Sequence, residues 1–88
     1  MIRRRVIVHG LVQGVFFRDT LWRRAVASGV TGCVRNKSDG TVEAVLEGEQ
    51  DPVERLVAFC REGPRGARVD RVDMTAEEPE GLAGFRVL

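Results

Sequence analysis

The 88-residue sequence is poor in the residues that build common metal and disulfide sites. It has one histidine, which cannot form a histidine metal cluster, and only two cysteines, without metal-ligand spacing. Cys33 and Cys60 are expected to be buried free thiols, with a bond between them as the alternative. Neither has an arginine six positions on, which excludes a cysteine phosphatase loop. We predict a protein without metal or cofactor.

Long apolar runs and a strong charge imbalance are also missing. No apolar stretch approaches the ~20 residues that span a bilayer, and the first residues are not followed by a signal-peptide core. The 14 basic and 13 acidic residues nearly cancel, so the chain carries no general electrostatic footprint for nucleic acid or membrane. We predict a cytoplasmic, monomeric protein with one domain, residues 1–88, and neither nucleic acid nor membrane as partner.

The first half of the chain alternates between strand and helix patterns. Arg5 to His9 is β-branched and apolar at its centre, which predicts a strand, and helical spacing follows from about Phe17 to Gly29. Val30 to Arg35 and Val42 to Glu47 then read as two strands of a hairpin around Asp39-Gly40. We expect the charges of residues 3–5 to be solvated at the start of the first strand.

Two of these elements show which face should be buried. The helix is expected to bury one apolar stripe in the core, formed by Leu21, Trp22, Ala25 and Val26. The second hairpin strand alternates: we expect Val42, Ala44 and Leu46 to meet the helices, and Glu43, Val45 and Glu47 to face water.

The second half of the chain reads as helix, strand and short strand. Asp51-Pro52 predicts a helix start with a capping carboxylate and a proline at the first position, and Gly63-Pro64 predicts its end. The apolar stripe of this helix is Val53, Leu56, Val57 and Cys60. Arg68 to Thr75 is strand-like, but its apolar set shifts between residues 69 and 72, which predicts a bulge. An acidic loop over residues 77–81 leads to a terminal strand, Phe85 to Leu88.

The element order predicts the topology of the sheet. Helical crossovers make the first strand parallel to the second and the third parallel to the fourth. If the third strand inserts beside the first, the result is an α+β, ferredoxin-like split βαβ arrangement (βαββαβ). It is an antiparallel sheet with two helices on one face and a short C-terminal fifth strand.

The segment between the first strand and the first helix suits an anion. Residues 9–18 read His-Gly-Leu-Val-Gln-Gly-Val-Phe-Phe-Arg. Gly10 and Gly14 permit backbone angles that let the chain curl and point several N–H groups inward. Arg18 arrives where the helix begins, adding a planar fork of donors to the positive end of the helix dipole. A plain strand-to-helix turn with a surface arginine is the alternative.

A second stretch of the sequence makes the first one more specific. Residues 32–42 read Gly-Cys-Val-Arg-Asn-Lys-Ser-Asp-Gly-Thr-Val. Together the two stretches resemble the motifs of the acylphosphatase family, Val-x-Gly-x-Val-Gln-Gly-Val-x-Phe-Arg and Gly-x-Val-x-Asn-x-x-Asp-Gly-x-Val. The resemblance runs from about Val6 to the C-terminal Gly-Phe-Arg-Val and implies the ferredoxin-like fold. Cys33 departs from it, because the family commonly has a bulky aromatic residue there; Trp22 would have to compensate from the helix.

The resemblance implies an activity and its residues. It implies an acylphosphatase, which hydrolyses small acyl phosphates to a carboxylate and inorganic phosphate. Arg18 would bind the phosphate and Asn36 would orient the attacking water. The loop amides around Leu11, Val12, Gln13, Gly14, Val15, Phe16 and Phe17 would complete the substrate-binding cradle, and no metal is implied.

Strand order supports this pairing independently of the family. Arg18 and Asn36 follow two parallel strands that one strand separates, so their backbones should lie roughly 10 Å apart, with room for a phosphoryl group. A carboxylate leaving group, with a pKa near ~4, departs without a general acid. Asn36 can accept a hydrogen bond from water but is hardly basic, so its expected role is orientation.

Other readings of these residues stay open. Asn36 by itself is also typical of a turn, and His9 is better read as a strand-end residue with an ordinary structural hydrogen bond. The alternative function is a non-catalytic ferredoxin-like module that binds phosphate or another regulatory ligand. RNA binding is disfavoured, because the central strands offer valine, isoleucine, alanine and glutamate in place of aromatic residues.

Overall fold

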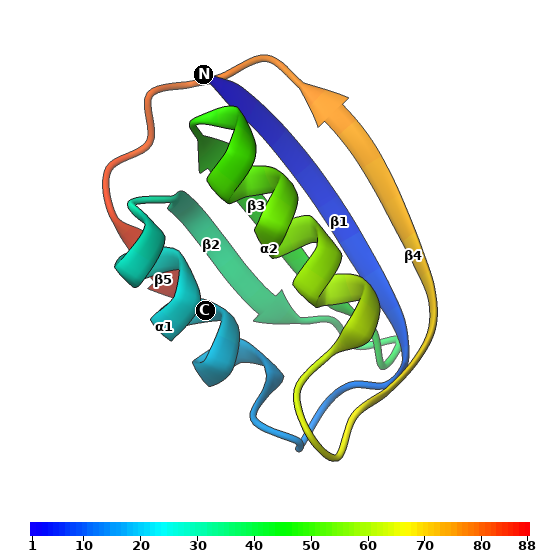
Figure 1. Cartoon of the computed structure of the whole chain (residues 1–88). Helices are drawn as coiled ribbons and strands as arrows, with labels where there is room; N and C mark the ends of the chain where they lie inside the picture. Colours follow the sequence, from blue (N-terminus) through cyan, green and yellow to red (C-terminus); the bar gives the residue numbers. More distant parts are fainter.

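The computed structural model describes residues 1–88 as a five-stranded sheet with two helices on one face (Figure 1). In chain order the elements are β1 (Ile2–Leu11), α1 (Phe17–Ser28), β2 (Thr31–Asn36), β3 (Val42–Gly48), α2 (Gln50–Glu62), β4 (Arg68–Glu77) and β5 (Phe85–Val87). None of the helices is long and apolar enough to cross a membrane.

The strand order is β4-β1-β3-β2-β5, which confirms the predicted split βαβ arrangement. β3 pairs antiparallel with both β1 and β2, so β1 and β2 run in the same direction with one strand between them. The short β5 lies at the other edge of β2 and runs parallel to it. Because each crossover helix returns the chain to the same end of the sheet, the C-terminal ends of β1 and β2 meet at one edge.

The predicted bulge is present in β4. Opposite β1, the register passes from His9–Arg71 to Gly10–Val69, so Asp70 is the extra residue. A Cβ atom on Gly10 would stand only 2.1 Å from the main-chain oxygen of Arg68. Gly10 therefore has φ 133° and no side chain because the bulged strand comes so close.

The core lies between the helices and the sheet. The predicted stripe of α2 is buried at all four positions, and Phe17 of α1 contacts Phe59 of α2 with ring centroids 5.9 Å apart. The expectation for α1 was half wrong: Leu21 and Ala25 are buried, but Trp22 and Val26 are 39% and 54% exposed. α1 packs on the narrow edge formed by β2 and β5, which covers only one side of its apolar stripe.

The prediction that the outer face of β3 sees water was wrong at two of three positions. Val45 and Glu47 are both buried, and the segment after β4 covers Glu47. The main-chain N–H groups of Glu80 and Leu82 donate to the two Glu47 carboxylate oxygens at 2.6 and 2.7 Å. Burial raises the pKa of Glu47, but these hydrogen bonds and the charge of Arg3 outweigh it, so the pKa is lowered.

Arg3 was also wrongly expected to be solvated. It is buried, its Nε donates to Glu77 Oε1 at 2.8 Å, and its Nη1 lies 3.7 Å from Glu47 Oε1. With Glu80 Oε2 at 3.7 Å from Nη2, three carboxylates compensate the desolvated guanidinium, which a strand pattern by itself does not reveal.

The start of α2 differs from the prediction as well. The helix begins at Gln50, so Asp51 lies in its first turn and makes no capping hydrogen bond, and Pro52 is the third helical residue. A carboxylate in the first turn still suits the helix dipole.

Candidate active site

The site forms where β1 and β2 end at the same edge of the sheet. Asn36, the last residue of β2, pairs with Val42 of β3, and Val42 pairs on its other side with Val8 of β1. The loop over residues 12–16 then rises from β1 to the first turn of α1, which carries Arg18. Parallel strands with one strand between them thus deliver both predicted catalytic residues to one place.

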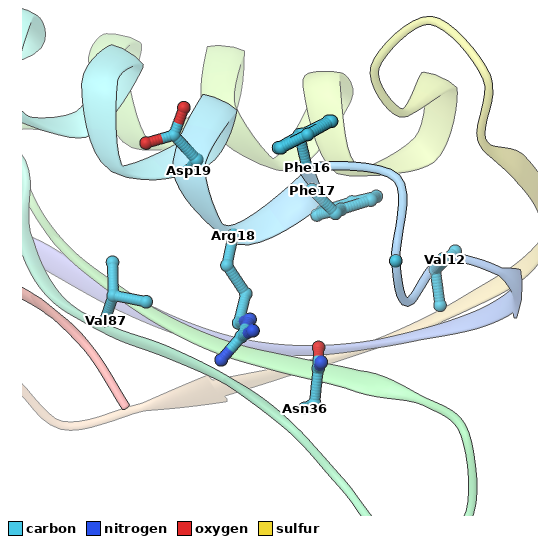
Figure 2. Close-up of a pocket in the computed structure, with 8 residues that line it drawn as sticks. Val12, Phe16, Phe17, Arg18, Asp19, Asn36 and Val87 are labelled. Carbon is cyan, nitrogen blue, oxygen red and sulfur yellow. The ribbon is translucent and has the colours of Figure 1, made fainter.

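A hollow of about 460 Å³ lies between these elements. Its lining residues are Val12, Gly14, Phe16, Phe17, Arg18, Asp19, Asn36 and Val87. Figure 2 shows the Arg18 guanidinium descending from α1 toward the Asn36 carboxamide, which points up from β2. The structure therefore brings Arg18 and Asn36 together in one hollow.

The loop curls at Gly14, as the sequence predicts, and also at Phe16, which was not predicted. Gly14 has φ 75° and Phe16 φ 60°, so two left-handed residues curl the chain ahead of α1. None of the main-chain N–H groups from Val12 to Asp19 donates a hydrogen bond within the chain; the first helical bond runs from Thr20 N–H to Phe16 O. These donors are available to a ligand or to water at the N-terminus of a helix.

Three of the predicted substrate-binding residues do not line the hollow with their side chains. Leu11 ends β1 with its side chain exposed, and Val15 packs against the edge of the core. Gln13 has a different contact: its Nε2 donates to the main-chain oxygens of Lys37 at 2.7 Å and Thr41 at 3.0 Å. Gln13 thereby ties the loop after β1 to the turn after Asn36.

Arg18 is hydrogen-bonded to Leu88, the residue that follows β5. Its Nη1 donates to the main-chain oxygen of Leu88 at 2.9 Å, while Leu88 N–H donates to Val34 of β2. Arg18 forms no ion pair, because the neighbouring carboxylate of Asp19 pairs with Arg23 one helical turn away, at 3.1 Å. The Asp19 carboxylate points away from the Arg18 guanidinium in Figure 2, which leaves that cation for a ligand.

The turn that follows Asn36 is built by local hydrogen bonds. Asp39 Oδ1 accepts from the Thr41 N–H at 3.0 Å and from the Thr41 hydroxyl at 2.6 Å. The hydrogen bonds from Thr41 hold the pKa of Asp39 below its usual range. Asp39 is thus a turn former, as expected, and stabilises the turn that follows Asn36.

The remaining candidate residues lie outside the hollow. His9 Nε2 is 2.9 Å from Asp73 Oδ2, a structural hydrogen bond as predicted. No group of three histidine, cysteine or acidic side chains is arranged to hold a metal ion. Cys60 is buried and Cys33 half-buried, both as free thiols. Cys33 alternates with the helix-facing Val34, so Trp22 of α1 cannot replace an aromatic residue there.

The contribution of β5 and Leu88 to this hollow was not predicted from the sequence. Val87 lines the hollow and Leu88 accepts the Arg18 hydrogen bond. Their only signal in the sequence was a short terminal strand, and nothing local showed that it adds to β2, opposite Val34.

The fold and the hollow define a small α+β, ferredoxin-like protein with Arg18 and Asn36 in one hollow at the edge of its sheet. A family model described as Acylphosphatase matches residues 4–87. The acylphosphatase of Thermococcus kodakarensis is 51% identical over 87 residues, covering 99% of this chain and 96% of that relative. That of Rubrobacter xylanophilus is 55% identical over 86 residues, covering 97% and 78%.

Solved structures agree with these sequence matches. A crystal structure of acylphosphatase from Bacillus subtilis superimposes with a TM-score of 0.95 at 31% identity, covering 100% of this chain and 99% of that one. An acylphosphatase from Coxiella burnetii gives a TM-score of 0.93 at 39% identity, covering 99% and 92%. The chain belongs to the acylphosphatase family, which confirms the resemblance and the prediction of an acylphosphatase enzyme.

Proposed function

We propose that this protein hydrolyses the carboxyl–phosphate bond of small acyl phosphates by direct attack of water on phosphorus. The observation that carries the proposal is the meeting of Arg18 and Asn36 in one hollow beside a loop of unpaired N–H groups. Phosphoryl transfer asks a protein mainly to position the reactants and to stabilise charge on the equatorial oxygens. Arginine and main-chain donors supply both.

Arg18 and the loop amides bind the phosphate in this proposal. One Arg18 donor is used by Leu88, and this contact fixes the direction of the guanidinium while its other N–H groups remain for phosphate oxygens. The amides from Val12 to Phe17 surround the other oxygens at the positive end of α1. Binding thus combines a fixed charge with preorganised neutral donors.

Asn36 orients the nucleophile. Its carboxamide oxygen accepts a hydrogen bond from water, and its position on β2 aims that water at a phosphorus atom held beside Arg18. The amide is too weak a base to remove the proton. As the water oxygen bonds to phosphorus, one proton stays on that oxygen and the other moves to a phosphate oxygen.

The leaving group needs no acid. The bond between phosphorus and the acyl oxygen breaks with its electron pair on oxygen, and the product is a carboxylate, a weak base whose conjugate acid has a pKa near ~4. An acyl phosphate dianion and water thus give a carboxylate and dihydrogen phosphate, with charges balanced. We accordingly propose activity without added metal, in a cytoplasmic monomer.

The test is hydrolysis of acetyl phosphate and benzoyl phosphate by the purified protein, with and without chelator. We expect turnover in both conditions and a kcat about 100-fold lower in Asn36→Ala, because the water is no longer positioned. Lys37→Ala is the matched control, since Lys37 is adjacent to Asn36 but does not line the hollow. Loss of activity with chelator, or full activity in Asn36→Ala, would falsify the mechanism. Phosphate binding without turnover would favour the non-catalytic module.

A further inference from the structure

Phe16 has an unusual backbone for a residue with a large side chain. Its φ of 60° and ψ of 26° make it left-handed, and it is the one non-glycine residue of the chain with positive φ. A left-handed conformation is unfavourable for a residue with a Cβ atom, and glycine avoids this cost. Residues held in such conformations cluster at functional sites.

The side chain of Phe16 does not contribute to the core. It is 80% exposed, whereas the next residue, Phe17, is 2% exposed and contacts Phe59 of α2. Phe17 therefore anchors the loop, and Phe16 forms part of the wall of the hollow that holds Arg18 and Asn36. Phe16 is thus strained at its backbone and exposed both at this hollow and at a second one between α1 and α2.

The geometry of the proposed reaction indicates which part of the substrate lies near Phe16. In-line displacement at phosphorus places the leaving group opposite the attacking water. Asn36, which orients that water, and Phe16 lie at opposite ends of the group of lining residues in Figure 2, with the Arg18 guanidinium on the Asn36 side. An acyl group that leaves away from Asn36 thus extends toward the wall that carries Phe16.

We propose that Phe16 recognises the acyl group and favours acyl phosphates whose acyl part is apolar, above all aromatic. Two aromatic rings gain from offset or edge-to-face contact beyond the area that they bury, and a methyl group offers far less surface. Four of the eight lining residues are apolar side chains, which suits the same substrates. This inference rests on the proposed function and adds the substrate class.

The experiment compares kcat/KM for benzoyl phosphate and acetyl phosphate in the wild type, Phe16→Gly and Phe16→Asn. Both replacements tolerate a left-handed backbone, so the loop is retained while the ring is lost. We expect the benzoyl-to-acetyl ratio to fall roughly three- to tenfold in both variants. We also expect a Tm in Phe16→Gly that is no lower than in the wild type, because the backbone strain is relieved.

The matched control is Trp22→Ala, which removes a partly exposed aromatic side chain of α1 that does not line the hollow. The benzoyl-to-acetyl ratio of kcat/KM in Trp22→Ala should equal that of the wild type. A wild-type ratio in Phe16→Gly or Phe16→Asn overturns the assignment of Phe16, even if acyl phosphates are hydrolysed. A wild type that hydrolyses neither substrate overturns the proposed function instead, so the two failures are distinguishable.

Discussion

The carboxamide of Gln13 lies 2.7 Å from the main-chain oxygen of Lys37 and donates a hydrogen bond to it. A second hydrogen bond reaches Thr41 at 3.0 Å, so one side chain of the first motif fixes the turn of the second. This contact joins the loop over residues 12–16 to the turn that follows Asn36. Gln13 thus positions the site without lining it.

We expect Gln13→Leu to lower kcat about tenfold with a smaller change in KM, because the turn that orients Asn36 loses its anchor. Removing two hydrogen bonds should also lower the free energy of unfolding by about 1–2 kcal/mol. Steady-state kinetics and urea unfolding measure the two effects. Gln50→Leu is the control, since the side chain of Gln50 hydrogen-bonds only to the exposed Glu54. Equal kcat values in the wild type and Gln13→Leu would show that Gln13 does not position the site.

Arg18→Lys should weaken competitive inhibition by inorganic phosphate about tenfold or more. An ammonium cannot reproduce the two-pronged contact of a guanidinium, and a hydrogen bond to a charged group contributes about 1.5–3 kcal/mol. The same exchange at Arg23, which pairs with Asp19 and lies outside the hollow, should leave inhibition as it is. If Arg18→Lys binds phosphate as tightly as the wild type, Arg18 is not the phosphate ligand.

Acid should destabilise the protein through the carboxylates that pair with Arg3 and Arg5. Hydrogen bonds from Arg5 and then Arg3 lower the pKa of Glu77 from 4.5 to about 2. A carboxyl whose folded pKa is depressed stabilises the fold above its unfolded pKa, and this contribution is lost as pH falls. The loss from Glu77 should therefore fall between about pH 4.5 and 2.

Urea unfolding midpoints measured over this pH range test the acid effect. Glu77→Gln should show a smaller decline than the wild type, because the group that titrates has been removed. Glu78→Gln is the control, since the neighbouring Glu78 is exposed and forms no ion pair. A decline in Glu77→Gln as steep as that of the wild type would assign the acid sensitivity to other groups.

The two thiols should differ in reactivity. Burial raises the pKa of Cys60 to about 12, which removes the reactive thiolate at neutral pH, whereas Cys33 is half-buried. A disulfide reagent should label one thiol in the native protein and two after denaturation. Cys33→Ser should then show no rapid labelling of the native protein, and a fast-reacting thiol in that variant would contradict the buried position of Cys60.

The sequence by itself determined the local elements and how they join. The stripe of α2 was readable because a helix that packs on a sheet repeats its apolar residues every three or four positions. The crossover rule made β1 parallel to β2, and with β3 placed between them this predicted that Arg18 and Asn36 meet. Both steps depend on short-range pattern and handedness, which a single sequence contains.

Only the tertiary structure decided which exposed-looking residues are buried and which apolar ones are not. Glu47 is covered by N–H groups 33 and 35 residues away, and Trp22 is uncovered because α1 lies over a narrow edge of the sheet. Likewise, β5 completes the wall beside Arg18 through a pairing with β2 far back in the chain. Periodicity shows that an element has an apolar face. How much of that face is covered, and by which other element of the chain, depends on long-range packing.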